Sequence, residues 1–286
     1  MLIAEFSSDY GAEIEWLSAK HTMQDHEYGG PTHMVKNGFG SIVDALVKEI
    51  SERKVKIMMN TPITKVVHGE NGKKAEVHCA DGSVVEGDRV VVTVPLGVLK
   101  SGKIAFEPPL PEWKQKAIER MQLAYMDKLI LEFDEAFWGD ESLWLIYFNN
   151  EAKRGRWMYT FNLFKFIGKP VLVMLNHGQS CLDLKDLSDQ EVIDDAMGEF
   201  KTMFGKEEVE KRTLKSYIRT NWTKDPFIGH TWAFVGIGGD LSDCDVLRKQ
   251  VDSQLYFAGE ATYAEFIGMT HGAYMSGRMT AQDIID

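Results

Sequence analysis

Cysteine is scarce in this chain, and long hydrophobic runs are absent. Among 286 residues there are three cysteines, Cys79, Cys181 and Cys244, at wide spacing and without a Cys-x-x-Cys pair. This pattern argues against a disulfide framework or a zinc knuckle and is typical of a reducing compartment. No apolar run approaches a membrane span, and the first residues lack the features of a signal peptide. We therefore expect an intracellular protein without a membrane partner, in the cytoplasm first, with the peroxisome and nucleus left open.

Positive charge is also in short supply. Lysine and arginine number 32 against 43 aspartates and glutamates, which leaves a formal net charge of −11 at pH 7. Such a chain repels phosphate backbones, so we expect no direct nucleic-acid binding, whereas a cationic partner is easier to accommodate. The composition, 44% hydrophobic and 26% charged, excludes collagen-like and disordered classes.

Several catalytic templates are missing. The chain has no Gly-x-Ser-x-Gly, His-Glu-x-x-His or P-loop motif. Two glycine-rich stretches, 38–40 and 236–239, fail the dinucleotide fingerprint because Val43 and Leu241 stand where its last glycine would fall. Both stretches therefore predict a turn or a helix entry.

Hydrophobic periodicity predicts helices and strands mixed along the chain without strict alternation. In the first clear helix Ile42, Leu46 and Ile50 share a face, and Ser41 with Asp44 suggests a cap. The predicted helices are 41–50, 118–123, 188–204 and 272–285, with weaker periodicity over 10–20; the predicted strands are 63–68, 74–79, 89–94, 128–133, 171–175 and 255–258. Strand 89–94 is almost all β-branched, as in a strand covered on both faces. The fold class is therefore α/β in the broad sense, α+β or a composite α/β architecture, and any two domains share segments because no linker separates them.

The last predicted helix carries small residues at Gly268, Gly272 and Ser276, four apart. That stripe suits close approach of another backbone or of a flat ligand, and spacing alone favours the packing interpretation. Lys128, at the start of a strand, is by default a solvated lysine, but beside a cofactor it could assist proton transfer. Trp222 and Trp232 either fill a core or stack on a flat ring.

Taken together, ordered segments along nearly the whole chain resemble the flavin-dependent amine oxidases, nearest to the polyamine oxidase and lysine-specific histone demethylase branch. The similar segments are 36–39 (KNGF), 93–100 (TVPLGVLK), 106–114 (FEPPLPEWK), Lys128 within KLILEF, 222–229 (WTKDPFIG), 257–262 (FAGEAT) and 271–277 (HGAYMSG). The resemblance implies an FAD enzyme of two interleaved domains. Residues 36–124 and 239–286 would form a partial FAD-binding domain, and residues 1–35 and 125–238 a substrate domain of mixed sheet plus helices.

The resemblance also implies roles for single residues around the flavin. Lys128 would be catalytic and hold a water next to flavin N5, and Trp222 would pack near the isoalloxazine ring. Ile63 would offer its backbone to the adenine, and Glu260 would bond the ribitol or diphosphate. Thr270, with Met269, would face the N1–C2 carbonyl edge at the start of the last helix.

For the substrate, the resemblance implies that Trp232 forms one wall of an amine cage and Met269 another, where many amine oxidases have an aromatic residue. The implied reaction transfers a hydride from the carbon beside a polyamine or methyl-lysine nitrogen to flavin N5, and O₂ is then reduced to hydrogen peroxide. A different class stays open: a flavin-free, inactive interaction scaffold with the back half of this fold.

Two departures from the family pattern lead to expectations. The family's N-terminal βαβ unit, with its glycine fingerprint for the FAD diphosphate, has no counterpart here. We therefore expect an incomplete FAD site and weak FAD binding, or none, by the isolated chain. The chain would be a fragment, a truncated gene product, or one whose missing half is supplied elsewhere by a partner. Thr231 stands where covalent monoamine oxidases have cysteine, so we expect noncovalent FAD. His230 replaces a frequent glycine near this position.

Overall fold

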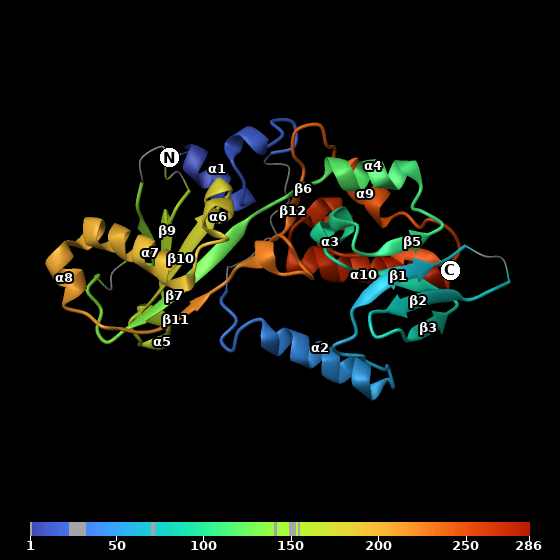
Figure 1. Ribbon diagram of the computed structural model, residues 1–286, viewed down its shortest axis with the longest axis horizontal. Helices are drawn as coiled ribbons and strands as arrows, with labels where there is room; N and C mark the ends of the chain where they lie inside the picture. Colours follow the sequence, from blue (N-terminus) through green and yellow to red (C-terminus); the bar gives the residue numbers. More distant parts are fainter. Residues whose placement is uncertain (1, 23–32, 70–71, 140–141, 149–152, 154) are drawn as a thin grey trace.

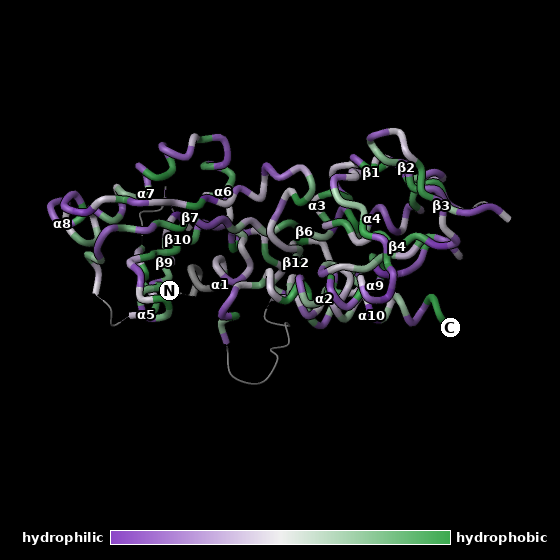
Figure 2. Tube along the Cα trace, turned by 90° about the horizontal axis from the view of Figure 1, so that it is seen from below, coloured by the Kyte–Doolittle hydropathy of each residue, from purple (hydrophilic) through white to green (hydrophobic). Residues whose placement is uncertain are grey.

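The computed structural model describes residues 2–22, 33–69, 72–139, 142–148, 153 and 155–286. The described chain forms an elongated molecule of two lobes, with one lobe around a large antiparallel sheet and the other around smaller sheets and α10 (Thr270–Ile285) (Figure 1). Figure 2 shows that the hydrophobic stretches gather in strands of both lobes. None of the helices in the described part combines the length and apolarity needed to cross a membrane.

The large sheet has five antiparallel strands. In spatial order these are β11 (Leu214–Arg219), β7 (Met126–Phe133), β10 (Val171–His177), β9 (Tyr159–Asn162) and β8 (Trp144–Ile146). In β7 the side chains of Leu129, Leu131 and Phe133 are fully buried, as the predicted alternation requires. They pack against Phe200 of α7 (Asp189–Phe204), and each buried side chain of this size contributes about 1.5–3 kcal/mol. The remaining helices of this lobe are α5 (Phe164–Ile167), α6 (Gln179–Leu184) and α8 (Lys206–Glu210).

The second lobe contains two further sheets. A four-stranded sheet has the order β3 (Val84–Gly87), β2 (Ala75–Cys79), β1 (Ile63–Val67) and β5 (Ala105–Glu107), with only β1 and β5 parallel. Beside it, β4 (Val90–Val92) and β13 (Leu255–Phe257) form a two-stranded parallel sheet. The helices of this lobe are α3 (Leu96–Ser101), α4 (Glu112–Arg120), α9 (Ser242–Arg248) and α10. Their apolar faces enclose a core that includes Leu96, Leu247 and Phe257.

The two lobes are joined by a short antiparallel pair, β6 (Gln122–Leu123) with β12 (Ala233–Phe234). A third apolar cluster lies at this junction. Ala12, Leu17, Ala124 and Phe234 are buried there, with Trp232 packed against them. α1 (Leu2–Tyr10) and the 3₁₀ turn Ile14–Trp16 lead into this cluster. The domain boundaries at 36–124 with 239–286, and 1–35 with 125–238, stay a prediction, and residues 23–32 lie outside the described part.

Most predicted elements are confirmed. The hairpin forms as β1 and β2, and helix 188–204 begins with a capping box in which Ser188 and Glu191 bond each other's backbone N–H. The structure corrects four details. Ser41 does not cap α2 (Gly40–Glu52), because its N-cap is Phe39 and the Ser41 hydroxyl donates to the Gly38 carbonyl. The helix expected over 118–123 ends at Arg120, since residues 122–123 pair with β12 instead.

The other two corrections concern residues 10–20 and β4. The weak helical periodicity over 10–20 corresponds to the end of α1 and a single 3₁₀ turn, because Gly11 (φ +58°) breaks the helix. β4 is not covered on both faces within the described residues, and its Val91 is 42% exposed. α2 is exposed as well: its apolar residues Ile42, Leu46 and Ile50 are each about 40% exposed, and it lies apart from the sheets (Figure 1).

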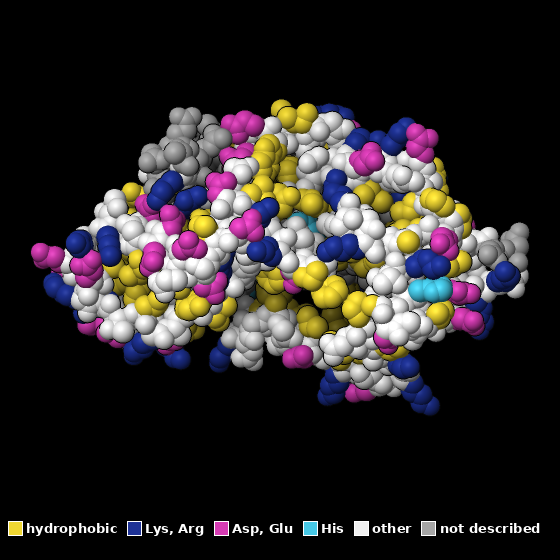
Figure 3. Space-filling model, viewed as in Figure 1, with side chains coloured by type: hydrophobic (Ala, Val, Ile, Leu, Met, Phe, Trp, Pro, Cys, Tyr) yellow, Lys and Arg dark blue, Asp and Glu magenta, His cyan; other side chains and the backbone are white. Residues whose placement is uncertain are grey.

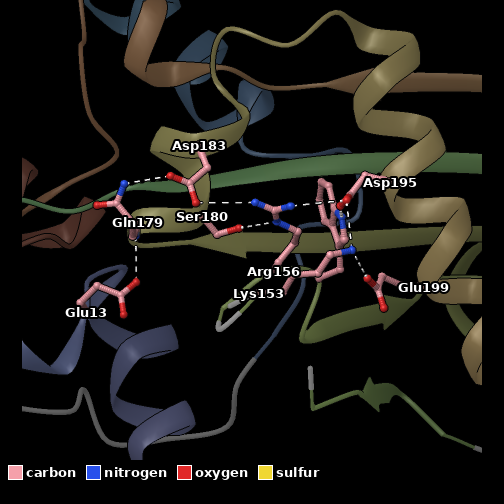
Figure 4. Close-up of polar contacts among 9 residues, drawn as sticks. Glu13, Lys153, Arg156, Gln179, Ser180, Asp183, Asp195 and Glu199 are labelled. Carbon is pink, nitrogen blue, oxygen red and sulfur yellow. Dashed lines mark hydrogen bonds and ion pairs between the residues drawn. The ribbon is translucent and has the colours of Figure 1, made fainter. Parts of the chain in front are cut away.

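A cluster of charged and polar side chains connects Lys153, Arg156 and Trp157 with helices α6 and α7 (Figure 4). Asp195 of α7 accepts hydrogen bonds from Trp157 Nε1 at 2.8 Å and Lys153 Nζ at 3.3 Å. Arg156 Nε donates to the Ser180 hydroxyl of α6 at 3.1 Å. Because buried charges are stable only when paired, the cluster has a structural function in this lobe.

Candidate functional site

The carboxyl ends of the parallel strands β4 and β13 open into a cavity of about 260 Å³. Residues 92–96 and 257–262 form two of its walls, and His230 and Thr231 form a third. In open α/β sheets, ligands bind in the crevice beyond the carboxyl ends of parallel strands. Hydrophobic side chains surround a hollow in the middle of the molecule (Figure 3). The cavity is therefore the first candidate for a cofactor site.

Glu260 lies on the wall of this cavity and connects two loops. Its Oε2 accepts hydrogen bonds from the backbone N–H of Ala233 at 3.2 Å and of Gly268 at 3.1 Å. Ala233 directly follows Trp232, and Gly268 directly precedes Met269. The carboxylate of Glu260 therefore holds together the two segments that carry the predicted amine cage.

His230 offers an unpaired nitrogen in the same cavity. The side chain is buried, and its Nδ1 bonds the carbonyl of Ile228 at 3.0 Å. Its buried Nε2 has no hydrogen-bond partner among the described residues and lies 3.8 Å from Glu260 Oε1, beyond hydrogen-bond distance. Buried polar atoms are seldom left unpaired, so this nitrogen marks a place where a polar ligand fits.

Trp232 and Met269 line a second cavity, of about 180 Å³, whose lining also includes Ala233 and Gly268, the backbone partners of Glu260. The indole of Trp232 packs between two glycines with positive φ: a Cβ would lie 2.9 Å from its Cζ2 at Gly11 and 3.0 Å from its Cδ1 at Gly268. Met269 is 47% exposed and precedes the first helical residue, Thr270, of α10. The structure thus brings together the two residues predicted to form the cage.

Lys128 and Trp222 lie on neighbouring segments of the large-sheet lobe. Lys128 is exposed on β7, and its backbone N–H and C=O bond Thr220, at 2.8 and 2.9 Å. Trp222 is half-buried at the start of the 3₁₀ turn Trp222–Lys224, and its backbone N–H bonds Asp127 Oδ1 at 3.1 Å. Asp127 and Thr220 therefore connect the backbones of these two predicted residues. Their roles beside a flavin stay a prediction.

The remaining predicted residues have simple settings. Ile63 is half-buried in β1, opposite Cys79 of β2, and packs on the core of its lobe. Thr270 is exposed at the N-terminus of α10, where the N-cap residue Met269 makes no side-chain cap and the helix dipole has its positive end. The roles of Ile63 and Thr270 toward FAD are not tested by these contacts.

The small-residue stripe of α10 has the packing function that its spacing favours. A Cβ on Gly272 would clash with the carbonyl of Phe266, and the buried Ser276 hydroxyl accepts from Gly259 N–H at 2.9 Å. Gly268 is the exception, since it packs on Trp232 at the cage. Close backbone contact, more than ligand contact, explains the stripe.

Metal chemistry has no support in the described part of the chain. No group of three histidine, cysteine or acidic side chains there could hold a metal ion. Cys79, Cys181 and Cys244 are buried, and none of them forms a disulfide within the described residues.

Asp127 is a site residue that sequence reasoning missed. Its carboxylate accepts from the Thr220 hydroxyl at 2.8 Å as well as from Trp222 N–H. Burial raises its pKa above the ordinary value, and the hydrogen bonds from Trp222 and Thr220 offset part of that shift. Its position beside Lys128, on the buried side of the alternating strand, was the available signal.

Comparisons with known proteins show the family of the chain. The family model for flavin containing amine oxidoreductase matches residues 5–285. The chain is 34% identical over 290 residues to "Lysine-specific histone demethylase 1 homolog 3" of Arabidopsis thaliana, covering 98% of this chain and 18% of that protein. It is also 34% identical over 275 residues to "Polyamine oxidase 2" of Arabidopsis thaliana, covering 96% of this chain and 53% of that protein.

A solved structure of putrescine oxidase, bound to putrescine, has a similar fold. The TM-score is 0.70 at 19% sequence identity, over 87% of this chain and 53% of that one. The chain therefore spans about half the length of the polyamine oxidase and the putrescine oxidase that it matches, and less of the demethylase. The likeness over nearly all of its residues, together with the mixed α/β fold, shows that the chain belongs to the family of flavin-containing amine oxidoreductases.

Proposed function

We propose that the protein containing this chain is an FAD-dependent amine oxidase acting on a polyamine or on a methylated lysine side chain. The observation that carries the proposal is the double contact of Glu260, which joins the cavity beyond β4 and β13 to the cavity between Trp232 and Met269. A cofactor and a substrate in these two cavities would be neighbours. Transfer of a hydride from a substrate to a flavin requires that the two molecules lie next to each other.

When bound, FAD supplies the acceptor for two electrons and a proton from the amine, and O₂ with water completes the reaction to a carbonyl, a free amine and hydrogen peroxide. The residues of this chain would bind the cofactor and the amine substrate and orient them toward each other. The His230 imidazole, whose Nε2 makes no hydrogen bond within the described residues, and the positive end of the α10 dipole are the groups that would meet the cofactor. Lys128 and Trp222, whose backbones are connected through Asp127 and Thr220, line neither of the two cavities, and their place beside the reacting carbon is a proposal that rests on the resemblance.

The substrate amine is proposed to lie against Trp232 and Met269. An indole face attracts an ammonium ion by about 0.5–2 kcal/mol, according to how far water is excluded. A thioether adds a flexible apolar wall, which tolerates amines of different bulk. The net charge of −11 favours the approach of a cationic substrate.

Noncovalent binding of the flavin is part of the proposal. Thr231 faces the cavity without a thiol, and its hydroxyl already bonds the backbone of Met126, accepting at 2.7 Å and donating at 3.1 Å. Acid precipitation should leave the flavin in the supernatant. Yellow protein in the pellet would contradict noncovalent binding.

Two measurements on the purified protein test the function. Titration with FAD should quench tryptophan fluorescence with weak, saturable binding, because the chain spans about half of its oxidase relatives. With saturating FAD, a peroxide-coupled assay against spermine, spermidine and methylated lysine peptides should identify the substrate. Lys128→Met should lower the peroxide rate at least tenfold, and the matched variant Lys169→Met should not. Absence of any FAD binding would favour the scaffold alternative for this chain.

A further inference from the structure

The first residues of β7 place a carboxylate behind Lys128. Successive side chains of a strand point to opposite faces, so exposed Lys128 and its neighbour Asp127 lie on different sides of the sheet. Asp127 shares its face with the fully buried Leu129. Directly opposite it in the antiparallel pair is Asn176 of β10. Two polar side chains therefore stand at the end of an otherwise apolar face.

Four hydrogen bonds connect Asp127 and Lys128 to the segment after β11. Asp127 Oδ1 accepts from the Thr220 hydroxyl at 2.8 Å and from Trp222 N–H at 3.1 Å. The same Thr220 hydroxyl accepts from Lys128 N–H at 2.8 Å, while Thr220 N–H donates to the Lys128 carbonyl at 2.9 Å. One carboxylate thus fixes the backbone of Trp222 directly and that of Lys128 through Thr220.

The surroundings make these bonds hard to replace by water. Asp127 and Asn176 border a space of about 10 Å³, which also touches Cys181 and Trp157. That is about the room for one water molecule. Asn176 Oδ1 is buried there without a partner among the described residues, so a single water in this space would donate to it. Asp127 itself is half-buried, so water competes less for its hydrogen bonds than it would at an exposed carboxylate.

We propose that Asp127 is a positioning residue: with the Thr220 hydroxyl it forms a clamp that sets the spacing between Lys128 and Trp222. The meaning of that spacing for flavin chemistry rests on the proposed function, whereas the clamp itself does not. A conformational effect of this kind is transmitted through the two backbones, because the Asp127 side chain points away from the face that carries Lys128.

The residue that follows β7 offers a matched control. Asp134, directly after the last strand residue Phe133, accepts through Oδ1 from the backbone N–H groups of Glu135 and Thr213, both at 2.9 Å. Asp134→Ala removes the same number of acceptor contacts as Asp127→Ala, next to the other end of the strand. It therefore separates a specific effect on Lys128 and Trp222 from a general weakening of the sheet.

Amide hydrogen exchange of the flavin-free protein tests the clamp. Asp127→Ala should speed exchange at Trp222 and Lys128 at least tenfold, whereas Asp127→Asn, which keeps an acceptor oxygen, should stay within threefold of the wild type. Thr220→Val should speed exchange of the Lys128 amide, while the Trp222 amide should stay better protected than in Asp127→Ala. Asp134→Ala should affect Glu135 and Thr213 only. Unchanged exchange in Asp127→Ala, or equal acceleration along all of β7, would overturn the proposal.

A second readout concerns the Lys128 side chain itself. Acylation of each lysine by a small amine-reactive reagent, followed by mass spectrometry, should show an altered rate at Lys128 in Asp127→Ala, by about threefold or more relative to Lys169. The Asn variant should restore the wild-type rate. If Asp127→Ala does not fold, Thr220→Val gives the same comparison. Because neither readout uses FAD, a clamp without flavin binding would count against the proposed function alone.

Discussion

At the scale of single residues, Glu260 shows how a carboxylate can shape a site by bonding backbone. Its Oε2 satisfies two N–H groups from different segments, and those segments carry Trp232 and Met269. The resemblance assigned Glu260 to the ribitol or diphosphate of FAD, and that role stays a prediction. The structure adds that Glu260 bonds the backbone next to Trp232 and Met269, the two residues predicted to form the cage.

Replacement of Glu260 should separate these contributions. Glu260→Ala leaves two backbone donors unpaired and should lower the free energy of unfolding by about 1–3 kcal/mol. Glu260→Gln keeps an acceptor oxygen and should cost less than half as much. Urea denaturation monitored by tryptophan fluorescence measures both. Equal losses in the two variants would contradict a hydrogen-bonding role.

Lys114 gives a pH-dependent stability. The side chain of Lys114 in α4 is fully buried, its Nζ donates to the carbonyl of Leu247 at 2.7 Å, and it lies 3.7 Å from the ring centroid of Phe257. Burial lowers its pKa to about 7, from 10.5 in the unfolded chain. Between these values the unfolded state binds more protons, so stability should rise with pH, by up to about 1.4 kcal/mol per pH unit.

Urea denaturation between pH 6 and pH 10 should reveal this rise in the wild-type protein. Lys114→Met should flatten the profile over that window, because the titrating group is gone. Lys116→Met removes an exposed lysine from the same helix and should leave the rise intact. A wild-type profile that is already flat would contradict the assigned shift.

At the scale of elements, α10 illustrates both the strength and the limit of sequence patterns. Its extent and its stripe of small residues follow from periodicity and spacing. Spacing alone could not decide between a ligand and a backbone as the neighbour of that stripe. The decision comes from the segment 257–266, which folds back across Gly272 and Ser276.

Two glycines of α10 therefore make a matched pair for mutation. Gly272→Ala would force a methyl group against the Phe266 carbonyl and should destabilise the protein by about 1–3 kcal/mol. A Cβ at Gly277 would meet no other described atom within 4 Å. Gly277→Ala should therefore stabilise the protein by about 0.5–1 kcal/mol, because alanine has the higher helix propensity. Thermal unfolding of both variants tests the pair, and stabilisation by Gly272→Ala would contradict the packing.

Some predictions of secondary structure are wrong because pairing with distant residues overrides the conformational preference of the local sequence. Residues 122–123 continue the apolar helical pattern of α4, yet they pair with Ala233 and Phe234 far along the chain. β4 has the β-branched composition of a strand buried on both faces, but it pairs only with β13 in the described residues. Neither outcome is encoded within a short window of sequence.

At the scale of the whole molecule, the acidic charge should affect substrate binding. If the proposed amine oxidase function holds, attraction between a chain of charge −11 and a polycationic amine weakens as salt shortens the Debye length from about 10 Å at 0.1 M. The apparent affinity for spermine should therefore fall roughly threefold or more between low and high salt. A monoamine substrate should respond less. Equal salt responses would show that the net charge does not guide binding.

Sequence by itself determined the family, the buried face of β7, the capping box of α7 and the extent of α10. Those features depend on local periodicity and on ordered motifs, which a single chain displays directly. Only the tertiary structure showed that Trp232 and Met269 share a cavity, that Glu260 joins their segments, and that Asp127 and Thr220 connect Lys128 to Trp222. These contacts join residues that are far apart along the chain, and the path of the backbone between them decides which side chains meet.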